Sequence, residues 1–182
     1  MGKRGRTSVA RFCGWDGLTK FLSKCDTPIK GALFATLFET GCRISEALQL
    51  HSDMLIDEGE RIVAYGVPVL KKRKVSVRNI PMPKHEKLVS PMMNWVEEKE
   101  GLLFEGINRY QAYTMINGVD SRWWCHRIRS ERATQLVVEY GFNIAELMKF
   151  FNWSQPSVAI GYVRLSVEDI RYKMVKKSTR VI

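Results

Sequence analysis

The sequence predicts an α+β domain that is mainly helical and carries one small three-stranded antiparallel sheet. Apolar residues recur at helical spacing over most of the chain. Residues 61–80 differ, because they are rich in Val and Ile and are flanked by turn residues and prolines, as short strands are. The chain has 182 residues, of which 45% are hydrophobic and 26% are charged, so it can form one domain with a buried core.

Helices are predicted before the sheet. Residues 15–24 can form a short helix. A second helix is expected to begin at Thr27 and Pro28, since a hydroxyl N-cap followed by Pro at the first helical position favours a helix start. Gly41 is typical of a helix stop, and a third helix is expected over residues 44–50.

The sheet itself is predicted from three strands, at residues 61–65, 67–70 and 75–80. The basic run 71–74 would form the tip between the last two strands, and Pro81 and Pro83 would end the sheet. The rest of the chain is predicted to be helical, at residues 86–98, 108–116, 123–140, 144–151, 156–163 and 167–177.

The formal net charge of +10 favours a polyanionic partner, because phosphate contacts release counterions. An anionic membrane surface is the alternative, but no apolar run approaches the roughly 20 residues that a membrane span requires. Residues 1–11 are basic, yet no apolar stretch and cleavage site follow, so we expect no secretory signal. We expect a basic flexible arm at residues 1–13 and one domain at residues 14–182.

The cysteines do not indicate a metal site or a disulfide framework. Cys13, Cys25, Cys42 and Cys125 form no C-x-x-C pair and do not cluster with the three histidines. We therefore expect isolated thiols in a reducing cytoplasm, no metal and no cofactor.

Two stretches carry the residues that could do chemistry. The first is TGCRISEALQL, from Thr40 to Leu50, and the second is HRIRSERATQLVVEYGFNIAELMKFFNWSQPSVAIGY, from His126 to Tyr162. They resemble the two signature boxes of the tyrosine recombinases, or phage-type integrases. Those boxes read T-G-x-R-x-S-E-x-x-x-L, and H-x-L-R-H-x-x-A-T followed by a glycine, L-G-H and a tyrosine nine residues later. The resemblance covers about residues 27–177 and implies the catalytic-domain fold of that family.

The resemblance also implies a site-specific recombinase that cleaves and rejoins DNA through a 3′-phosphotyrosyl intermediate, with the catalytic set Arg43, Lys72, His126, Arg129, Trp153 and Tyr162. Arg43 and Arg129 would hold the scissile phosphate, and Tyr162 would attack it. His126 would assist proton transfer, and Trp153 would donate its indole N–H to the phosphate.

The general acid is expected at the tip of the basic hairpin, where the family has a lysine. Lys72 is favoured because it ends the predicted strand, and Lys71 or Lys74 remain alternatives. Lys71, Arg73 and Lys74 of this tip, together with Arg127, are also expected to contact DNA.

The chemistry of these residue types fits the same reaction. A tyrosine phenol, with a reference pKa of about 10, is a weak nucleophile unless its surroundings help it. Two guanidiniums can hold the non-bridging oxygens and stabilise a pentacoordinate transition state, and a lysine can protonate the leaving oxygen. Neither metal nor ATP is required, which agrees with the absence of a clustered carboxylate set in the sequence. Glu46 is expected to support an arginine rather than to react.

The chain departs from the family pattern at three positions and in its length. Ser130 stands where the family often has a second histidine, and Asn152 and Trp153 replace the usual Gly-His pair. Trp keeps one donor but cannot transfer a proton, so His126 and the hairpin lysine would carry more of the acid–base work. We expect no N-terminal core-binding domain, because residues 1–26 are too few to form one.

Alternative functions remain open from the sequence. Residues 133–162 also read as helix, glycine turn and helix, which is typical of a non-catalytic helix-turn-helix DNA reader. A type IB topoisomerase would share the chemistry, and a catalytically silent relative would only bind DNA. Tyr172 is the rival nucleophile, whereas His51 and His85 look incidental.

The expected partner is double-stranded DNA, without a membrane. Recombination joins two duplexes through four active sites, so a homo-tetramer is expected on DNA. Residues 165–182 are amphipathic and could dock on a neighbouring subunit or pack on their own domain. The expected setting is the cytoplasm of a prokaryote, close to the nucleoid, with a mobile element or virus as the source.

Overall fold

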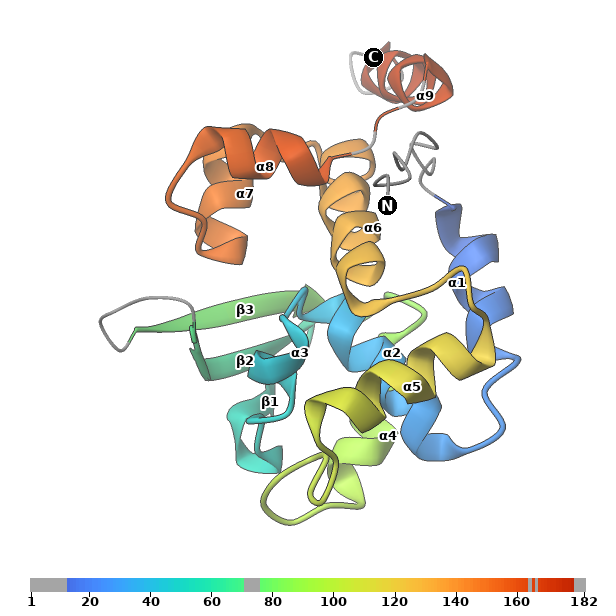
Figure 1. The fold of residues 1–182 in the computed structure, drawn as a ribbon. Coiled ribbons are helices and arrows are strands. Elements are labelled where there is room, and N and C mark those ends of the chain that lie inside the picture. The colour runs from blue at the N-terminus through green and yellow to red at the C-terminus, as the bar shows by residue number, and fades with distance from the viewer. Residues whose placement is uncertain (1–12, 71–75, 164, 166, 179–182) are drawn as a thin grey trace, which may run out of the picture.

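A computed structural model describes residues 13–70, 76–163, 165 and 167–178 (Figure 1). Residues 1–12 and 71–75 therefore lie outside the described part, so the predicted N-terminal arm, its boundary at residue 13 and the hairpin tip stay predictions. The helices are α1 (Gly14–Leu22), α2 (Pro28–Glu39), α3 (Ile44–Ala47), the 3-10 turn η1 (Ser52–Met54), α4 (Val89–Glu97), α5 (Arg109–Val119), α6 (Cys125–Val138), α7 (Ile144–Phe151), α8 (Pro156–Tyr162) and α9 (Val167–Ser178).

A three-stranded antiparallel sheet of order β1-β2-β3 completes the fold, from β1 (Leu55–Asp57), β2 (Arg61–Pro68) and β3 (Val77–Pro83). The mainly helical α+β class is confirmed, but the predicted strand boundaries were wrong. Residues 61–65 and 67–70 are not two strands, because β2 continues to Pro68 through a register shift between Ala64 and Val67. Gly66 lies there at a φ of +64°, which glycine adopts without a steric penalty.

The third strand of the sheet is β1, which the sequence did not predict. It has three residues, and only Leu55 of them is buried, so it lacks the alternation that marks a strand. At the other edge, β3 runs through Pro81 to Pro83 instead of ending at residue 80. An edge strand tolerates proline because its outer N–H groups need no partner in the sheet.

Helix α2 forms the centre of the core. Every residue from Gly31 to Glu39 is buried, so the helix is covered on all sides. It packs against α4, α5 and α6, and Figure 1 shows it passing behind α5 and α6. A helix buried all round positions its C-terminal end firmly, and the turn into α3 begins there.

Helices α3, α4 and α5 differ from the prediction by three residues at one end, α5 because it continues to Val119 instead of residue 116, and α1 and α6 differ by one or two residues at each end. Helix α4 begins at Val89 rather than at residue 86, which puts Pro91 in its first turn, where its missing N–H costs no hydrogen bond. Helix α3 is only one turn long and ends at Ala47 rather than at residue 50. None of the helices in the described part is long and apolar enough to cross a bilayer.

A network of buried charges joins α2, α6 and the turn that precedes α4. Arg132, which is fully buried, has Nη1 2.6 Å from Glu86 Oε2 and Nη2 3.5 Å from Glu39 Oε2. Gln135 Nε2 and Tyr140 Oη also donate to Glu86. Burial raises the pKa of Glu39 well above its usual range, although Arg132 opposes the shift. Burial would also raise the pKa of Glu86, but Glu39 and Arg132 hold it below its usual value. Two carboxyls therefore share one guanidinium, and Glu39 is the one that binds a proton more readily.

Glu39→Gln should change how stability depends on pH. Because the folded pKa of Glu39 lies above the unfolded value of about 4.3, its stabilising contribution is complete below that pH and is lost as pH rises through the folded pKa. Gln keeps the neutral shape without ionising. We expect the free energy of unfolding of the wild type, relative to that of the variant, to fall with rising pH by up to about 1.4 kcal/mol per pH unit. Urea denaturation at several pH values measures it.

Glu86→Gln is the matched control. It removes the ionised partner of a buried arginine, so it should destabilise the protein by about 3–5 kcal/mol at pH values above the unfolded pKa of a glutamate, and by less as pH falls through the lowered pKa of Glu86. A difference between wild type and Glu39→Gln that does not vary with pH would contradict the raised pKa of Glu39.

Candidate active site

The first sequence box forms a tight turn that leads into α3. Gly41 has a φ of +57°, and a Cβ at this position would lie 2.4 Å from the Phe151 ring, so both conformation and space require glycine. Arg43 follows as the N-cap residue of α3. Its backbone N–H donates to Glu46 Oε2 at 2.9 Å, and its Nη1 lies 2.8 Å from Glu46 Oε1. The start of α3 thus orients Arg43 from both its backbone and its side chain.

Glu46 is fully buried and lies among three guanidiniums. Besides Arg43, Arg78 Nη2 lies 3.4 Å and Arg129 Nη1 4.0 Å from Glu46 Oε2. The prediction that Glu46 supports an arginine rather than reacting agrees with this geometry. A carboxylate so placed can offset part of the repulsion among the three cations and fix their directions.

Arg129 lies on the buried face of α6 with only 1% of its surface exposed. Its Nη1 donates to the carbonyl of Gly41, and its Nη2 donates to the carbonyl of Phe151 at 3.2 Å. Burial, together with the positive charges of Arg78 and Arg43, lowers the pKa of Arg129 to about 9, while Glu46 opposes this shift. The negative charge of Glu46 does not balance the positive charges around Arg129, so an anion bound beside Arg129 would be stabilised.

Three aromatic rings are stacked next to Arg129. Phe151 and Trp153 stack with centroids 4.3 Å apart, and Trp153 and Tyr162 stack with centroids 4.8 Å apart. The Arg129 guanidinium carbon lies 5.8 Å from the centroid of the Tyr162 ring. Trp153 Nε1 is buried and has no hydrogen-bond partner among the described residues. A buried indole N–H in this state can donate to a ligand oxygen, and the phosphate contact of Trp153 stays a prediction.

Tyr162 ends α8 and lies beside His126 of α6. Its Oη is 3.1 Å from His126 Nδ1, a hydrogen-bond distance, although the two residues are 36 positions apart. Ser130 Oγ donates to the backbone carbonyl of Tyr162, so the end of α8 is tied directly to α6. The serine that replaces the family's second histidine therefore helps to position the tyrosine.

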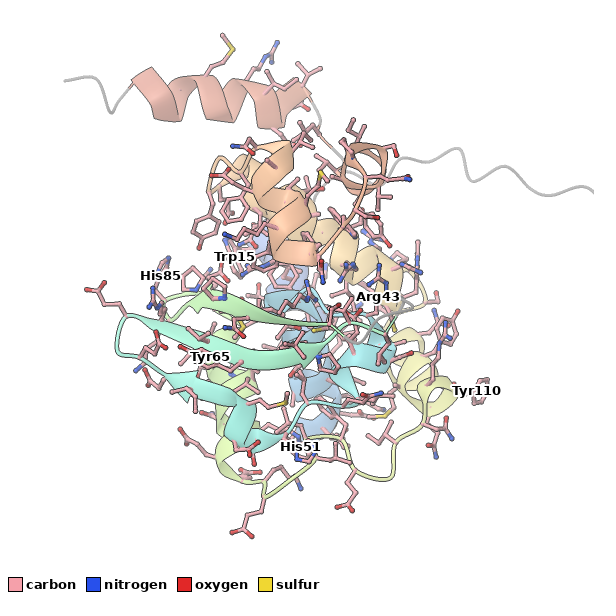
Figure 2. All side chains as sticks on the ribbon, turned by 90° about the vertical axis from the view of Figure 1, so that its left-hand side faces the viewer. Trp15, Arg43, His51, Tyr65, His85 and Tyr110 are labelled. Carbon is pink, nitrogen blue, oxygen red and sulfur yellow. The ribbon has the colours of Figure 1, made fainter. Side chains whose placement is uncertain are left out.

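A cavity of about 760 Å³ opens beside these residues. It is lined by Arg43, Glu46, His126 and Arg129 on one side and by the start of α5 on the other, with Arg109, Tyr110 and Tyr113. Figure 2 shows Arg43 where the sheet meets α6, and Tyr110 pointing away from the body of the protein. Arg43 and Arg129 thus line a pocket whose walls are basic and aromatic.

The structure brings together five of the six predicted catalytic residues: Arg43, His126, Arg129, Trp153 and Tyr162. The sixth, Lys72, lies outside the described residues, as do Lys71, Arg73 and Lys74. Arg127 does not line the cavity, because it packs on the Trp123 ring and pairs with Glu131. Its predicted DNA contact remains a prediction. His51 and His85 lie away from Arg43 in Figure 2.

Sequence reasoning missed Arg78 of β3. The spacing could have indicated it, because Arg78 lies two residues before Ile80 and four before Met82. It therefore shares the face of β3 that these two residues bury. It also left unexplained why asparagine replaces glycine at residue 152. Asn152 ends α7 with φ +52° and ψ +46°, a left-handed conformation that asparagine tolerates better than most residues. No group of three or more His, Cys, Asp or Glu side chains gathers as metal ligands within the described ranges.

Comparison with solved structures finds the same fold in several DNA recombinases. XerA recombinase matches with a TM-score of 0.72 and 15% identity, over 97% of this chain and 66% of that one. XerH site-specific recombinase, in a post-cleavage complex with palindromic difH substrate, gives 0.65 and 18% over 86% and 50%. The Tn1549 transposon integrase in complex with circular intermediate DNA gives 0.65 and 17% over 92% and 65%. The chain thus spans between half and two thirds of the length of the chains that it matches in these structures.

The sequence comparison identifies the family. No curated relative matches the chain. The profile of the phage integrase family matches residues 16–169, which include both boxes and the residues around the cavity. The match covers well over half of the sequence and agrees with the fold. The chain therefore belongs to the phage integrase family.

Proposed function

We propose that this chain is the catalytic domain of a site-specific recombinase that cuts one strand of duplex DNA with Tyr162 and rejoins it to another strand. The observation that carries the proposal is the position of the Tyr162 hydroxyl, 3.1 Å from His126 Nδ1 and beside the buried Arg129. One of the six tyrosines of the sequence thus has both a base and a phosphate-binding cation beside it.

In the cleavage step the scissile phosphate binds between Arg43 and Arg129. The Tyr162 oxygen attacks phosphorus, its proton passes to His126 Nδ1, and an O–P bond forms while the bond from phosphorus to the 5′-oxygen breaks. His126 must be neutral, with its other nitrogen carrying the proton. The products are a 3′-phosphotyrosyl bond on Tyr162 and a free 5′-hydroxyl.

The leaving 5′-oxygen requires a proton, which a lysine of the hairpin tip supplies. Lys72 is the preferred candidate, with Lys71 and Lys74 as alternatives. Rejoining is the reverse step, in which a 5′-hydroxyl of another strand attacks the phosphotyrosyl phosphorus. The phosphotyrosyl bond replaces the phosphodiester bond one for one, so the cycle requires no ATP, and the residues assigned here supply the acid, the base and the cations without a metal.

The duplex would lie across the mouth of the cavity. Arg109, Tyr110 and Tyr113 line its outer wall, and Tyr110 has 77% of its surface exposed. Lys71, Arg73 and Lys74, with Arg127, would add further phosphate contacts. The net charge of +10 supports a nucleic-acid partner.

Strand exchange between two duplexes requires four active sites, so we propose that four protomers assemble on DNA. Helix α9 offers a surface for this contact, because Val167, Ile170 and Met174 are more than 45% exposed. A mobile element or virus acting in a prokaryotic cytoplasm is the proposed setting, and a transposon integrase among the structural neighbours supports a mobile element.

The alternative functions explain fewer of the contacts in the site, or require a separate experiment. A helix-turn-helix reader would explain α6 and α7, but it would not require three arginines around a buried carboxylate. A type IB topoisomerase would use the same residues. Relaxation of supercoiled plasmid without strand exchange would identify it.

Tyr162→Phe should abolish covalent attachment to DNA, because phenylalanine keeps the ring stacking on Trp153 but has no attacking oxygen. The probe is a pool of nicked suicide duplexes with a randomised core, and the readout is an adduct on a denaturing gel. The wild type should form the adduct and Tyr162→Phe should leave only background.

Tyr172→Phe is the control for this experiment and should keep the wild-type yield of adduct. An adduct that survives in Tyr162→Phe would refute the assignment of the nucleophile. If the wild type binds duplexes specifically but forms no adduct, the helix-turn-helix alternative is favoured.

Single substitutions of the tip lysines should identify the general acid. Lys72→Ala is expected to lower the cleavage rate by about 10²–10⁴-fold on an ordinary phosphodiester. A 5′-phosphorothiolate substrate should restore its rate to near that of the wild type, because a thiolate leaves without a proton. If Lys71→Ala or Lys74→Ala is restored and Lys72→Ala is not, the choice of Lys72 is wrong.

A further inference from the structure

We propose that Arg78 is a positioning residue of the active site, a third guanidinium that acts on the scissile phosphate through Glu46 and through its charge. The inference rests on the function proposed above and deepens it. Arg78 lies outside both sequence boxes, on a strand whose role would otherwise be to carry the hairpin.

The location of Arg78 is unusual for a charged residue. In β3 the buried positions alternate, and Ile80 and Met82 occupy the other two. Arg78 takes the place of an apolar residue in this row, with 8% of its surface exposed. Burying a guanidinium is costly unless it is paired, so its partners indicate what it does there.

Those partners lie in or directly after the turn that contains Arg43, and at the end of α7, where a second carbonyl accepts a hydrogen bond from Arg129. Arg78 Nη1 donates to the carbonyl of Phe150, next to the Phe151 carbonyl that accepts from Arg129. Its Nη2 lies 3.4 Å from Glu46 Oε2 and 3.5 Å from Cys42 Sγ, next to Arg43. Arg78 therefore joins the end of α7, the turn before α3 and the strand that leads from the basic hairpin.

The side chains of the arginine cluster, which are Arg43, Arg78, Arg129 and Glu46, carry a net positive charge. Arg43, Arg78 and Arg129 contribute three positive charges and Glu46 one negative charge, which leaves +2 in a region of low solvent exposure. A phosphodiester carries one negative charge, whereas the pentacoordinate transition state carries two. Without Arg78 the cluster would match the ground state, and with it the cluster matches the transition state. Interactions that are stronger in the transition state raise the rate rather than the affinity.

In this proposal Arg78 acts on the phosphate without touching it. It does not line the cavity that Arg43, His126 and Arg129 share. Its effect must therefore pass through Glu46, through the backbone carbonyls that also hold Arg129, and through its electric field. A role confined to folding would be independent of the charge on the substrate, and this difference makes the two roles distinguishable.

The test compares Arg78→Gln, which removes the charge but keeps a side-chain donor, with Arg78→Lys, which keeps the charge. Arg61→Met on the neighbouring strand is the matched control, because Arg61 is exposed, pairs with Glu58 and is not among the residues that line the cavity. The single-turnover cleavage rate at saturating DNA and the dissociation constant for DNA are measured with a nicked suicide duplex that the wild type cleaves. The same duplex is also made with a methylphosphonate, which is uncharged, at the scissile position.

We expect Arg78→Gln to cleave the phosphodiester about 10²-fold more slowly than the wild type, with a dissociation constant within about threefold. Arg78→Lys should recover part of this rate, and Arg61→Met should behave as the wild type. On the methylphosphonate, the ratio of wild-type rate to Arg78→Gln rate should shrink by about tenfold, because the substrate charge on which Arg78 acts is gone.

Equal rates for the wild type and both Arg78 variants would overturn the inference, and so would a rate ratio that is the same on both substrates. If Arg78→Gln does not fold, Arg78→Lys decides alone: a slower cleavage rate at unchanged affinity supports the positioning role, and an unchanged rate overturns it. If the wild type itself forms no adduct with any duplex, the proposed recombinase function fails, which is a different result from cleavage that is insensitive to Arg78.

Discussion

The site depends on one buried carboxylate, that of Glu46. Without it, Arg43, Arg78 and Arg129 would repel one another in a region from which water is largely excluded. With it, Arg43 and Arg78 have a hydrogen-bonding partner, Arg129 has a carboxylate 4.0 Å away, and the cluster still carries excess positive charge. Gly41 is a second residue on which the position of Arg129 depends. Its carbonyl accepts from Arg129, and its missing Cβ leaves room for the Phe151 ring. Charge and close packing thus restrict the turn into α3 together.

The second constraint is the stack of Phe151, Trp153 and Tyr162 against Arg129. It links the end of α7 to the end of α8 and leaves the Tyr162 hydroxyl beside His126. Trp153 is stacked on both sides, so its indole N–H has a fixed direction although it lacks a partner among the described residues. Stacking of this kind positions a tyrosine without using its hydroxyl, which remains available for chemistry.

The fold class and most helices could be predicted because their signals are local. Pro28 and the spacing of apolar residues define α2, and residues 144–151 were predicted to the residue because Asn143 caps α7. The sheet was predicted less well, since Gly66 joins two expected strands into one and β1 is too short to show alternation. The boxes named most of the residues that meet. The spacing along β3 could have shown that Arg78 is buried, but its distance from Glu46, and the role of Glu46 as a shared partner, depend on tertiary contacts.

The central claim is that Tyr162 becomes joined to DNA beside the arginine cluster. Mass spectrometry of the covalent adduct, after digestion with nuclease and protease, tests it most directly. The account predicts a nucleotide bonded through its 3′-phosphate to the peptide that contains Tyr162, with fragment ions that place it on that side chain. A nucleotide on Tyr172, on a non-tyrosine side chain, or bonded through its 5′-phosphate would contradict the account.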